Sequence, residues 1–159
     1  MARLHSIRRP IFRKFAGLDA ERRALLVEAV ACLTGARLAL VFVPFPRLAR
    51  RLGSFVPPVD SRVRDASSPA PAGHSRHAER IGWAVTRAAR YVPFRAVCLP
   101  QAMAARIMLR RRGIRSVLHF GAAKRGREPF ETHAWLDAAG VEVTGYPVAM
   151  ESVEIASFV

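Results

Sequence analysis

The stretch that decides the fold is residues 98–122, CLPQAMAARIMLRRRGIRSVLHFGA, because its hydrophobic period changes partway along. Up to Arg112 the pattern is helical, and Pro100 is tolerated because the amides of a first helical turn have no intrahelical acceptor. Gly113 suits a left-handed cap, and the arginines before it complement the helix dipole. From Arg115 to Ala122 the period is 2, which predicts a strand.

The residues that follow predict an antiparallel sheet. THAWL, residues 132–136, reads as a second strand, joined to the first by the polar loop KRGREPFE. The DAAG turn at residues 137–140 should then reverse the chain into VEVTG, residues 141–145, to make a hairpin. Helices followed by antiparallel strands are an α+β pattern, so we expect N-terminal helices packed on a small antiparallel sheet.

The first half of the chain is expected to be helical. Asp19 is a suitable N-cap for a helix that runs to about Leu40, because Pro44 and Pro46 prevent its continuation. A short basic helix is expected next, and a longer one closer to the cysteine. The predicted spans of these two helices are residues 45–52 and 78–91.

The serine, proline and alanine residues between these helices predict a flexible loop at residues 54–77. We therefore expect one domain over residues 1–159 with three parts. These are an N-terminal helical arm at 1–53, the loop, and a catalytic core at 78–159.

The composition fits one buried core and raises one alternative function. A chain of 159 residues can bury most of its apolar surface. Its formal charge of +14 suggests nucleic acid, but 24 of its 26 basic residues are Arg, and they are scattered without interleaved aromatic side chains. We expect no nucleic-acid partner, and keep a basic binding module for nucleic acid or an anionic membrane as the alternative.

The most apolar segment, residues 24–45, predicts a buried helix. Glu28 and Arg37 interrupt it, so no uncharged run long enough to span a membrane remains. The basic start of the chain is followed by Asp19 without a small-residue cleavage site, so we expect no signal peptide and a cytoplasmic protein. Residues 1–15 predict a solvated basic arm, with peripheral contact to an anionic membrane surface as a second interpretation.

The two cysteines are too few for a disulfide framework or a four-cysteine zinc site. We expect both to be reduced, with no metal and no cofactor. Cys32 lies inside an apolar helix and is expected in the core. Cys98 opens a helix, where amide dipoles stabilise the thiolate, which is the form of cysteine that attacks carbonyls. Cys98 is therefore the candidate nucleophile.

A thiol nucleophile needs a base, and the sequence offers five histidines. His5, His74 and His77 fall in segments that are expected to be mobile. His119 and His133 lie on the two predicted strands, and periodicity does not choose between them.

Several motifs together resemble the transglutaminase-like, papain-related cysteine peptidases, and most closely the leader peptidases of lasso-peptide biosynthesis, the catalytic C-terminal part of the lasso B protein. The resemblance covers most of residues 20–146. It rests on ALLVEA, PFPRLARRLG, GWAVTRAARYVPFRAVCL, the cysteine helix, LHFG and HAWLDAAGVEV, in that order. It implies a transglutaminase-like or papain-like core, with Cys98 as nucleophile and His133 as base.

The resemblance also implies a substrate and partners. The substrate would be a ribosomally made lasso precursor peptide, whose leader is removed before a separate ATP-dependent, asparagine-synthetase-like cyclase closes the macrolactam. Fewer than 20 residues precede Asp19, too few for a leader-recognition module, so a separate leader-recognition protein is expected.

The third catalytic residue departs from the family pattern. The family places an Asp about a dozen residues after the histidine, but that region reads Val143, Thr144, Gly145. A turn symmetric about DAAG would place Thr144 opposite His133, as a weak acceptor. Asp137 is four residues along the strand and an unlikely direct partner, and Glu142 requires a shifted register. A catalytically impaired homologue is therefore a further alternative.

Overall fold

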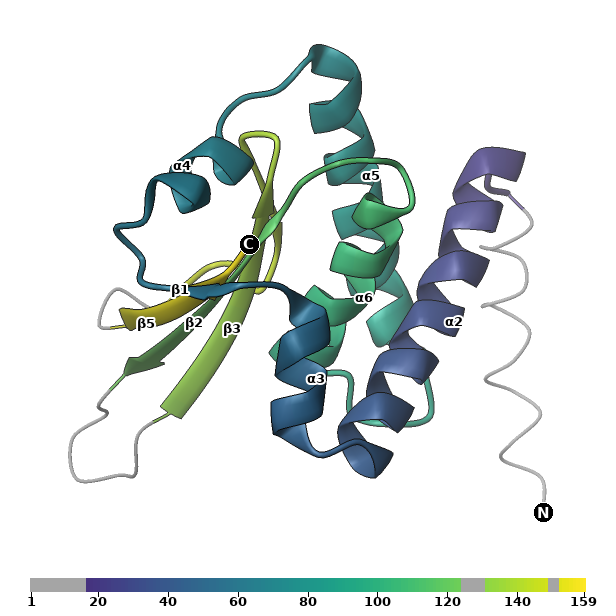
Figure 1. The fold of residues 1–159 in the computed structure, drawn as a ribbon. Coiled ribbons are helices and arrows are strands. Elements are labelled where there is room, and N and C mark those ends of the chain that lie inside the picture. Colours follow the sequence, from purple (N-terminus) through teal and green to yellow (C-terminus); the bar gives the residue numbers. More distant parts are fainter. Residues whose placement is uncertain (1–16, 124–130, 149–151) are drawn as a thin grey trace.

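The computed structural model describes residues 17–123, 131–148 and 152–159, and shows an α+β fold (Figure 1). The helices of the described residues are α2 (Ala20–Phe42), α3 (Phe45–Leu52), α4 (Ser61–Ser67), α5 (Ala72–Ala89) and α6 (Cys98–Arg110). The strands are β1 (Phe55–Val56), β2 (Val117–Ala123), β3 (Glu131–Ala138), β4 (Val141–Thr144) and β5 (Val153–Phe158). They form one antiparallel sheet in the order β1-β5-β2-β3-β4, so the predicted fold class is confirmed.

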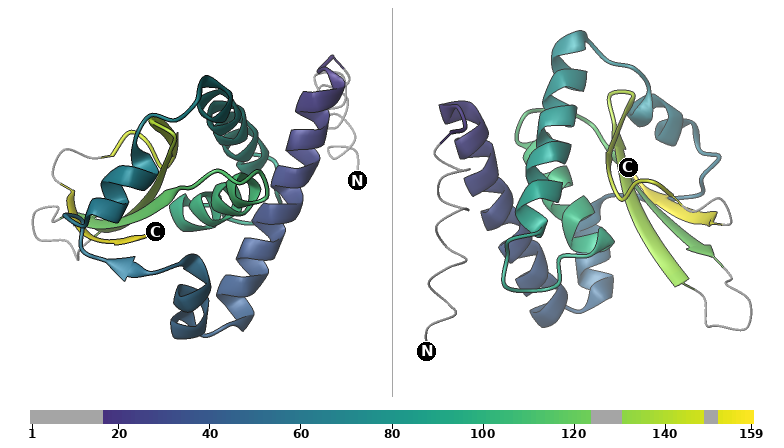
Figure 2. Two further views of the ribbon diagram at one scale, coloured as in Figure 1. Left: turned by 45° about the horizontal axis from the view of Figure 1, so that its top comes forward. Right: turned by 180° about the vertical axis from the view of Figure 1, so that it is seen from behind.

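The sheet lies between two helical layers. Helices α5 and α6 cover one face, where they contact β3 and β4, and α2 packs on the outside of both helices (Figures 1 and 2). The short helix α4 covers part of the other face, where its Val63 and Ala66 pack with Val117 of β2. The main core therefore lies between the helices and one face of the sheet, and α2 belongs to it rather than forming a separate arm.

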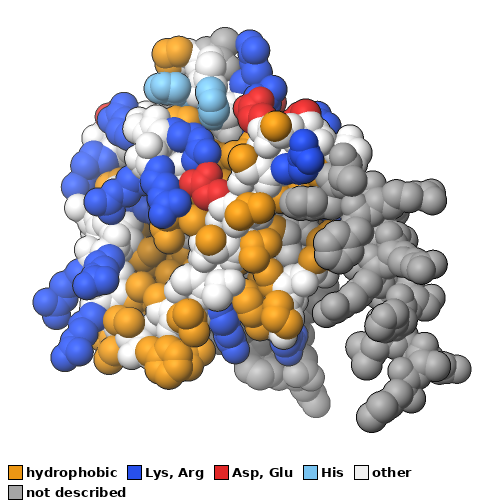
Figure 3. Space-filling view, turned by 90° about the vertical axis from the view of Figure 1, so that its right-hand side faces the viewer, with side chains coloured by type: hydrophobic (Ala, Val, Ile, Leu, Met, Phe, Trp, Pro, Cys, Tyr) orange, Lys and Arg blue, Asp and Glu red, His pale blue; other side chains and the backbone are white. Residues whose placement is uncertain are grey.

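Helix α2 is apolar on its outer side as well as on its inner side. The Asp19 side chain caps its start by accepting a hydrogen bond from the Arg22 amide at 2.7 Å. Its buried side contributes Leu33 and five other residues to the core, yet several large apolar side chains are exposed, seen as part of the orange surface in Figure 3. These exposed residues are Val27, Val30, Leu38, Val41 and Phe42. By length and composition alone, α2 is also long and apolar enough to cross a membrane.

An ion-pair group ties α2 to the end of α6. Glu28 accepts hydrogen bonds from Arg112 at 2.7 and 3.2 Å and from Arg111 at 3.2 Å. The hydrogen bond from Arg112 is the main reason why the pKa of Glu28 lies below its usual range. After the helix, Gly113 takes φ +69° and the Ile114 amide bonds back to the Leu109 carbonyl, which confirms the predicted glycine cap.

The prediction of a flexible loop at residues 54–77 is wrong. The segment contains β1, which pairs with β5, then α4, and then the first turns of α5, which begins at Ala72 rather than at residue 78. Two local signals explain the difference: the Asp60 side chain caps α4 by accepting from the Arg62 amide at 2.9 Å, and Pro71 stands at the N-cap of α5. Val63 and Ala66 then bury α4 against the sheet.

The predicted hairpin is present, but its register differs from the symmetric one. The turn consists of Ala139 and Gly140, both with positive φ (54° and 76°), as a two-residue hairpin turn requires. The turn is centred one residue later than in the symmetric DAAG arrangement, which moves the partner of Thr144 from His133 to Trp135, and a bulge moves it one residue further, to Leu136. Strand β5 was not predicted, and the loop KRGREPFE falls at residues 124–131, of which 124–130 lie outside the described part.

Candidate active site

Cys98 is the first residue of α6, as predicted. The N-cap residue Val97 has no side-chain hydrogen bond to the helix, Pro100 has no amide hydrogen, and the Gln101 amide bonds to the Val97 carbonyl at 3.3 Å. Within the described residues, the amides of Cys98 and Leu99 therefore have no backbone acceptor. These two donors point out of the start of the helix, where a negative charge is favoured.

The loop before the thiol is held by α6 itself. Gln101 Nε2 donates to the Ala96 carbonyl at 2.6 Å, which fixes the chain two residues before Cys98. Cys98 is half-buried and Cys32 is buried in α2, and both are free thiols. Burial raises the pKa of Cys32, so Cys32 behaves as the core residue that was predicted.

His133 lies near the start of β3 with its ring held by the backbone. Its Nε2 lies 2.6 Å from the Gly145 carbonyl oxygen. A carbonyl can only accept, so Nε2 carries the hydrogen, and in the neutral ring the basic nitrogen is Nδ1. The ring also stacks on Trp135, with centroids 6.0 Å apart.

The Gly145 carbonyl, twelve residues after His133, stands where the family pattern expects the orienting carboxylate. The expectation that Thr144 would accept from His133 is wrong, because the position of the turn and the bulge together place Thr144 opposite Leu136, and its buried hydroxyl has no partner among the described residues. Gly145 reaches the ring through a close approach: its φ is +86°, and a Cβ there would be 2.5 Å from the Ala134 carbonyl oxygen. Only glycine fits this position without strain.

The two predicted catalytic side chains are not joined by a hydrogen bond in the described structure. Strand β3 pairs with β2 in unbroken register, so its side chains alternate. Ala134 and Leu136 face the helices and belong to the core cluster against which Cys98 packs, whereas His133 shares the other face with Trp135. The thiol and the imidazole thus belong to different faces of β3, and their catalytic pairing stays a prediction.

His119 lies on the same face as His133 but is enclosed by carboxylates. Its Nδ1 is 2.6 Å from Glu154 Oε1, and its Nε2 is 3.3 Å from Asp137 Oδ2, an ion-pair distance without good hydrogen-bond alignment. The side chains of Tyr146 and Ser157 donate to Asp137 and Glu154 respectively. Side-chain carboxylates, and not a backbone group, therefore hold His119.

The protonation of this cluster follows from its burial and charges. Burial opposes a charged ring, but the hydrogen bonds and charges of Asp137 and Glu154 exceed that effect and raise the pKa of His119. Burial and the Asp137 contact raise the pKa of Tyr146 as well. Because both ring nitrogens of His119 face carboxylates, neither is available to a substrate, and His133 is the strand histidine with a ring nitrogen available.

The other carboxylates and histidines considered from the sequence make no hydrogen bond to His133 in the described structure. Asp137 serves His119 and Tyr146, not His133, and Glu142 is exposed opposite Asp137. His74 and His77 lie in the ordered helix α5 rather than in a mobile segment, and His5 lies outside the described residues. No group of three or more His, Cys, Asp or Glu side chains among the described residues is arranged to hold a metal ion.

No sequence pattern points to the carbonyl that holds His133. A backbone acceptor leaves no side-chain motif, and Gly145 could have been singled out only as a glycine directly after a predicted strand. The cluster around His119 was missed because Glu154 lies on the unpredicted strand β5.

A comparison with protein-family models found a match that covers these elements. The model of the transglutaminase-like superfamily matches residues 39–157, about three quarters of the chain, and this span contains both Cys98 and His133. Comparisons with curated proteins and with solved structures found no match. The matched span begins within α2 and ends in β5, so it includes the helix that carries the thiol and the whole sheet except Phe158. The chain belongs to the transglutaminase-like superfamily.

Proposed function

We propose that this chain is a cysteine peptidase that removes the leader from a lasso-peptide precursor, with Cys98 as nucleophile and His133 as base. The observation that carries the proposal is the placement of Cys98 at the start of α6, beside two amides without backbone acceptors. The superfamily match supports cysteine chemistry of the peptidase or acyl-transfer kind. The substrate class comes from the resemblance of the sequence motifs.

The proposed reaction has two stages. His133 Nδ1 takes the proton from the Cys98 thiol as the sulfur attacks the carbonyl at the end of the leader, and then gives that proton to the leaving amine. Water, deprotonated by the same nitrogen, hydrolyses the thioester and releases the leader. The amides of Cys98 and Leu99 would hold the oxyanion of each tetrahedral intermediate, an effect worth about 3 to 4 kcal/mol per donor in comparable sites.

The proposal includes a rearrangement of the start of β3 that turns the His133 ring to the face on which Cys98 packs, because the described structure places the ring on the opposite face. Catalytic hydrogen bonds in unliganded enzymes often form only when substrate is bound. His133→Cys, made in a Cys32→Ala background, tests this approach with a short bifunctional thiol reagent added with and without precursor peptide. Efficient cross-linking to Cys98 that increases with peptide is expected, whereas no cross-link under either condition would exclude His133 as the base.

We further propose the partners and the compartment of the reaction. A separate protein would recognise the leader, and an ATP-dependent, asparagine-synthetase-like cyclase would close the ring in the cytoplasm after cleavage. Peripheral contact with an anionic membrane through residues 1–15 stays a prediction, because these residues lie outside the described part of the chain.

The direct test is a cleavage assay with matched cysteine variants. Purified protein, the leader-binding partner and the precursor encoded beside it are incubated with wild type, Cys98→Ala or Cys32→Ala, and the products are weighed by mass spectrometry. Wild type and Cys32→Ala should release the leader, and Cys98→Ala should release none. Cleavage by Cys98→Ala would refute the nucleophile, while a product joined to an added amine would indicate acyl transfer instead of hydrolysis.

Thiol reactivity separates the peptidase from a basic binding module. With iodoacetamide near pH 6, Cys98 should be alkylated well before Cys32, and His133→Ala should slow the labelling of Cys98. His74→Ala, which removes an exposed histidine from α5, is the control and should leave the rate unchanged. Equal and slow labelling of both cysteines in wild type would favour the binding module.

A further inference from the structure

A cavity lined by arginines lies at the opposite end of α6 from Cys98. It has a volume of about 530 Å³ and is bounded by the C-terminal part of α6, by α4 and by the chain that enters β2. Arg110, on its wall, is twelve residues after Cys98, which is roughly 18 Å along a helix. The cavity is thus separate from the proposed catalytic site, and its size is typical of sites for small ligands.

Arg106 places a half-buried positive charge in this wall. Its Nη1 donates to the carbonyl oxygens of Ser116 at 3.0 Å and Phe158 at 2.8 Å. Burial, and then the charge of nearby Arg110, lower the pKa of Arg106 to about 10. None of the ion pairs among the described residues involves this guanidinium, and its two hydrogen bonds there both run from Nη1 to neutral carbonyls.

The position of Arg106 is fixed by backbone around it. Gly53 passes so close that a Cβ at that residue would lie 2.8 Å from Arg106 Nη2 and 2.2 Å from the Val159 carbonyl oxygen. A glycine there makes room for the guanidinium. The donors of Arg106 are therefore preorganised rather than carried on a freely moving side chain.

The other charged side chains of the cavity leave it with an excess of positive charge. Arg110 and Arg115 reach it from exposed positions, and none of the ion pairs among the described residues involves them. Arg62 is already neutralised by Asp60 at 2.9 Å. Asp65 supplies the one acidic side chain of the lining.

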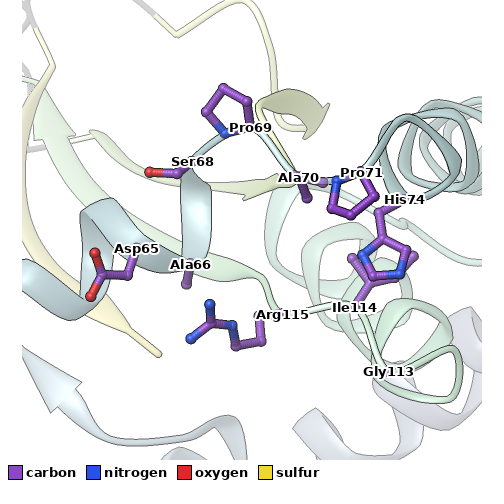
Figure 4. A pocket seen from close by; sticks show the side chains of 11 residues that line it. Asp65, Ala66, Ser68, Pro69, Ala70, Pro71, His74, Gly113, Ile114 and Arg115 are labelled. Atoms are coloured by element: carbon purple, nitrogen blue, oxygen red, sulfur yellow. The ribbon is translucent and has the colours of Figure 1, made fainter.

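A second, smaller cavity adjoins this one and shares part of its wall. Figure 4 shows this neighbouring cavity, with the Arg115 guanidinium next to Ala66 of α4 and with Asp65 on the same helix. Helix-dipole compensation accounts for Arg110 near the end of α6, but it accounts neither for Arg115, which lies beyond the helix, nor for the open donors of Arg106.

We propose that this cavity binds a small polyanion, whose phosphate or carboxylate oxygens accept from Arg106, Arg110 and Arg115. Guanidinium groups donate two parallel hydrogen bonds to such oxyanions, and three of them on two sides of one cavity suit a ligand with more than one anionic group. The site does not involve Cys98 and is independent of the proposed peptidase activity.

Isothermal titration calorimetry on the full chain at constant ionic strength tests this site, with pyrophosphate and citrate as probes. One of the two should bind saturably at a single site, with a dissociation constant below about 1 mM. Preference for pyrophosphate would identify a phosphate ligand, and preference for citrate a carboxylate ligand. The absence of saturable binding of either probe at this concentration would overturn the proposal.

Charge-matched variants distinguish the cavity from the general basicity of the chain. Arg110→Ser and Arg115→Ser should each weaken binding at least about tenfold, the effect of losing a hydrogen bond to a charged group. Arg50→Ser removes the same charge from an exposed position on α3 and should change the affinity less than about twofold. Equal losses in all three variants would mean diffuse electrostatic binding and refute the site.

Arg106→Lys gives a further readout, since it keeps the charge and removes the planar fork. Folded Arg106→Lys protein that binds the probe as tightly as wild type would exclude the role of Arg106. If this variant does not fold, Arg110→Ser and Arg115→Ser still decide the question.

Discussion

Gly145 holds His133 through a close backbone contact, and replacing Gly145 by Ala should break that contact at a measurable cost. The residue has φ +86°, and a new Cβ would lie 2.5 Å from the Ala134 carbonyl oxygen and 2.8 Å from the Cα and Cβ of Trp135. These are atoms of the sheet itself, so β3 and the chain after β4 must separate to accept the methyl group.

A second glycine isolates the backbone part of this cost. Gly113 has φ +69°, and a Cβ there would have nothing within 4 Å. The left-handed conformation costs a non-glycine residue about 1 to 2 kcal/mol. Alanine also restricts the unfolded chain more than glycine does, which offsets about 0.4 to 1 kcal/mol of this cost. Gly113→Ala should therefore lower the free energy of unfolding by about 1 kcal/mol.

Gly145→Ala has the same conformational cost and adds steric overlap. Overpacking a well-packed region costs about 1 to 3 kcal/mol, which brings the expected total for Gly145→Ala to about 2 to 4 kcal/mol. With a urea m-value of about 2 kcal/mol/M, the unfolding midpoint should fall by about 0.5 M for Gly113→Ala and by about 1 to 2 M for Gly145→Ala.

Urea denaturation followed by circular dichroism measures both variants against wild type. Equal midpoints for the two variants would refute the close approach of Gly145 to β3. A second readout connects the contact to function: below the unfolding transition, Gly145→Ala should cleave precursor more slowly than Gly113→Ala, because its His133 ring has lost its fixed acceptor.

Other expected outcomes concern Leu33 in the core, Glu28 in the ion-pair group, and buried His119. Leu33→Ala should cost about 2 to 5 kcal/mol in urea unfolding because Leu33 is fully buried, whereas Leu38→Ala, at an exposed site of the same helix, should cost far less. Glu28→Gln should lower the free energy of unfolding by about 1 to 3 kcal/mol at pH 7. The difference from wild type should become smaller in acid, because wild type loses the contribution of Glu28 as the pH falls through its lowered pKa. A difference that does not depend on pH would contradict the ion-pair group. Because the pKa of His119 is raised in the folded state, protonation of His119 should stabilise the fold, fully below about pH 6.5 and progressively less as the pH rises through the folded pKa. The free energy of unfolding measured across this window should therefore decrease in wild type and stay constant in His119→Gln.

The helices near the thiol could be predicted because their start and stop signals are local. Asp19, Pro100 and Gly113 each act within one turn of their own position, and the structure confirms the helix ends that they mark. The change of period after Gly113 likewise identified the sheet.

Features that depend on contacts between distant residues could not be predicted. Strand β1 has two residues and exists because it pairs with β5, and α4 is short and is buried through Val63. The register that keeps Thr144 away from His133 depends on where the turn is centred and on a bulge, and the bulge leaves no pattern in the sequence. Periodicity placed His133 and His119 on strands, but the carboxylates that immobilise His119 come from two different strands.

The strand order has a consequence for biosynthesis. Strand β5, the last element of the chain, is inserted between β1 and β2, which do not pair with each other. While residues 153–158 are still inside the ribosome, β2 has one partner only, and its other edge offers unpaired backbone groups to any neighbouring chain. The nascent protein therefore cannot close its sheet until residues 153–158 have left the ribosome, and this interval is when it would depend most on chaperones.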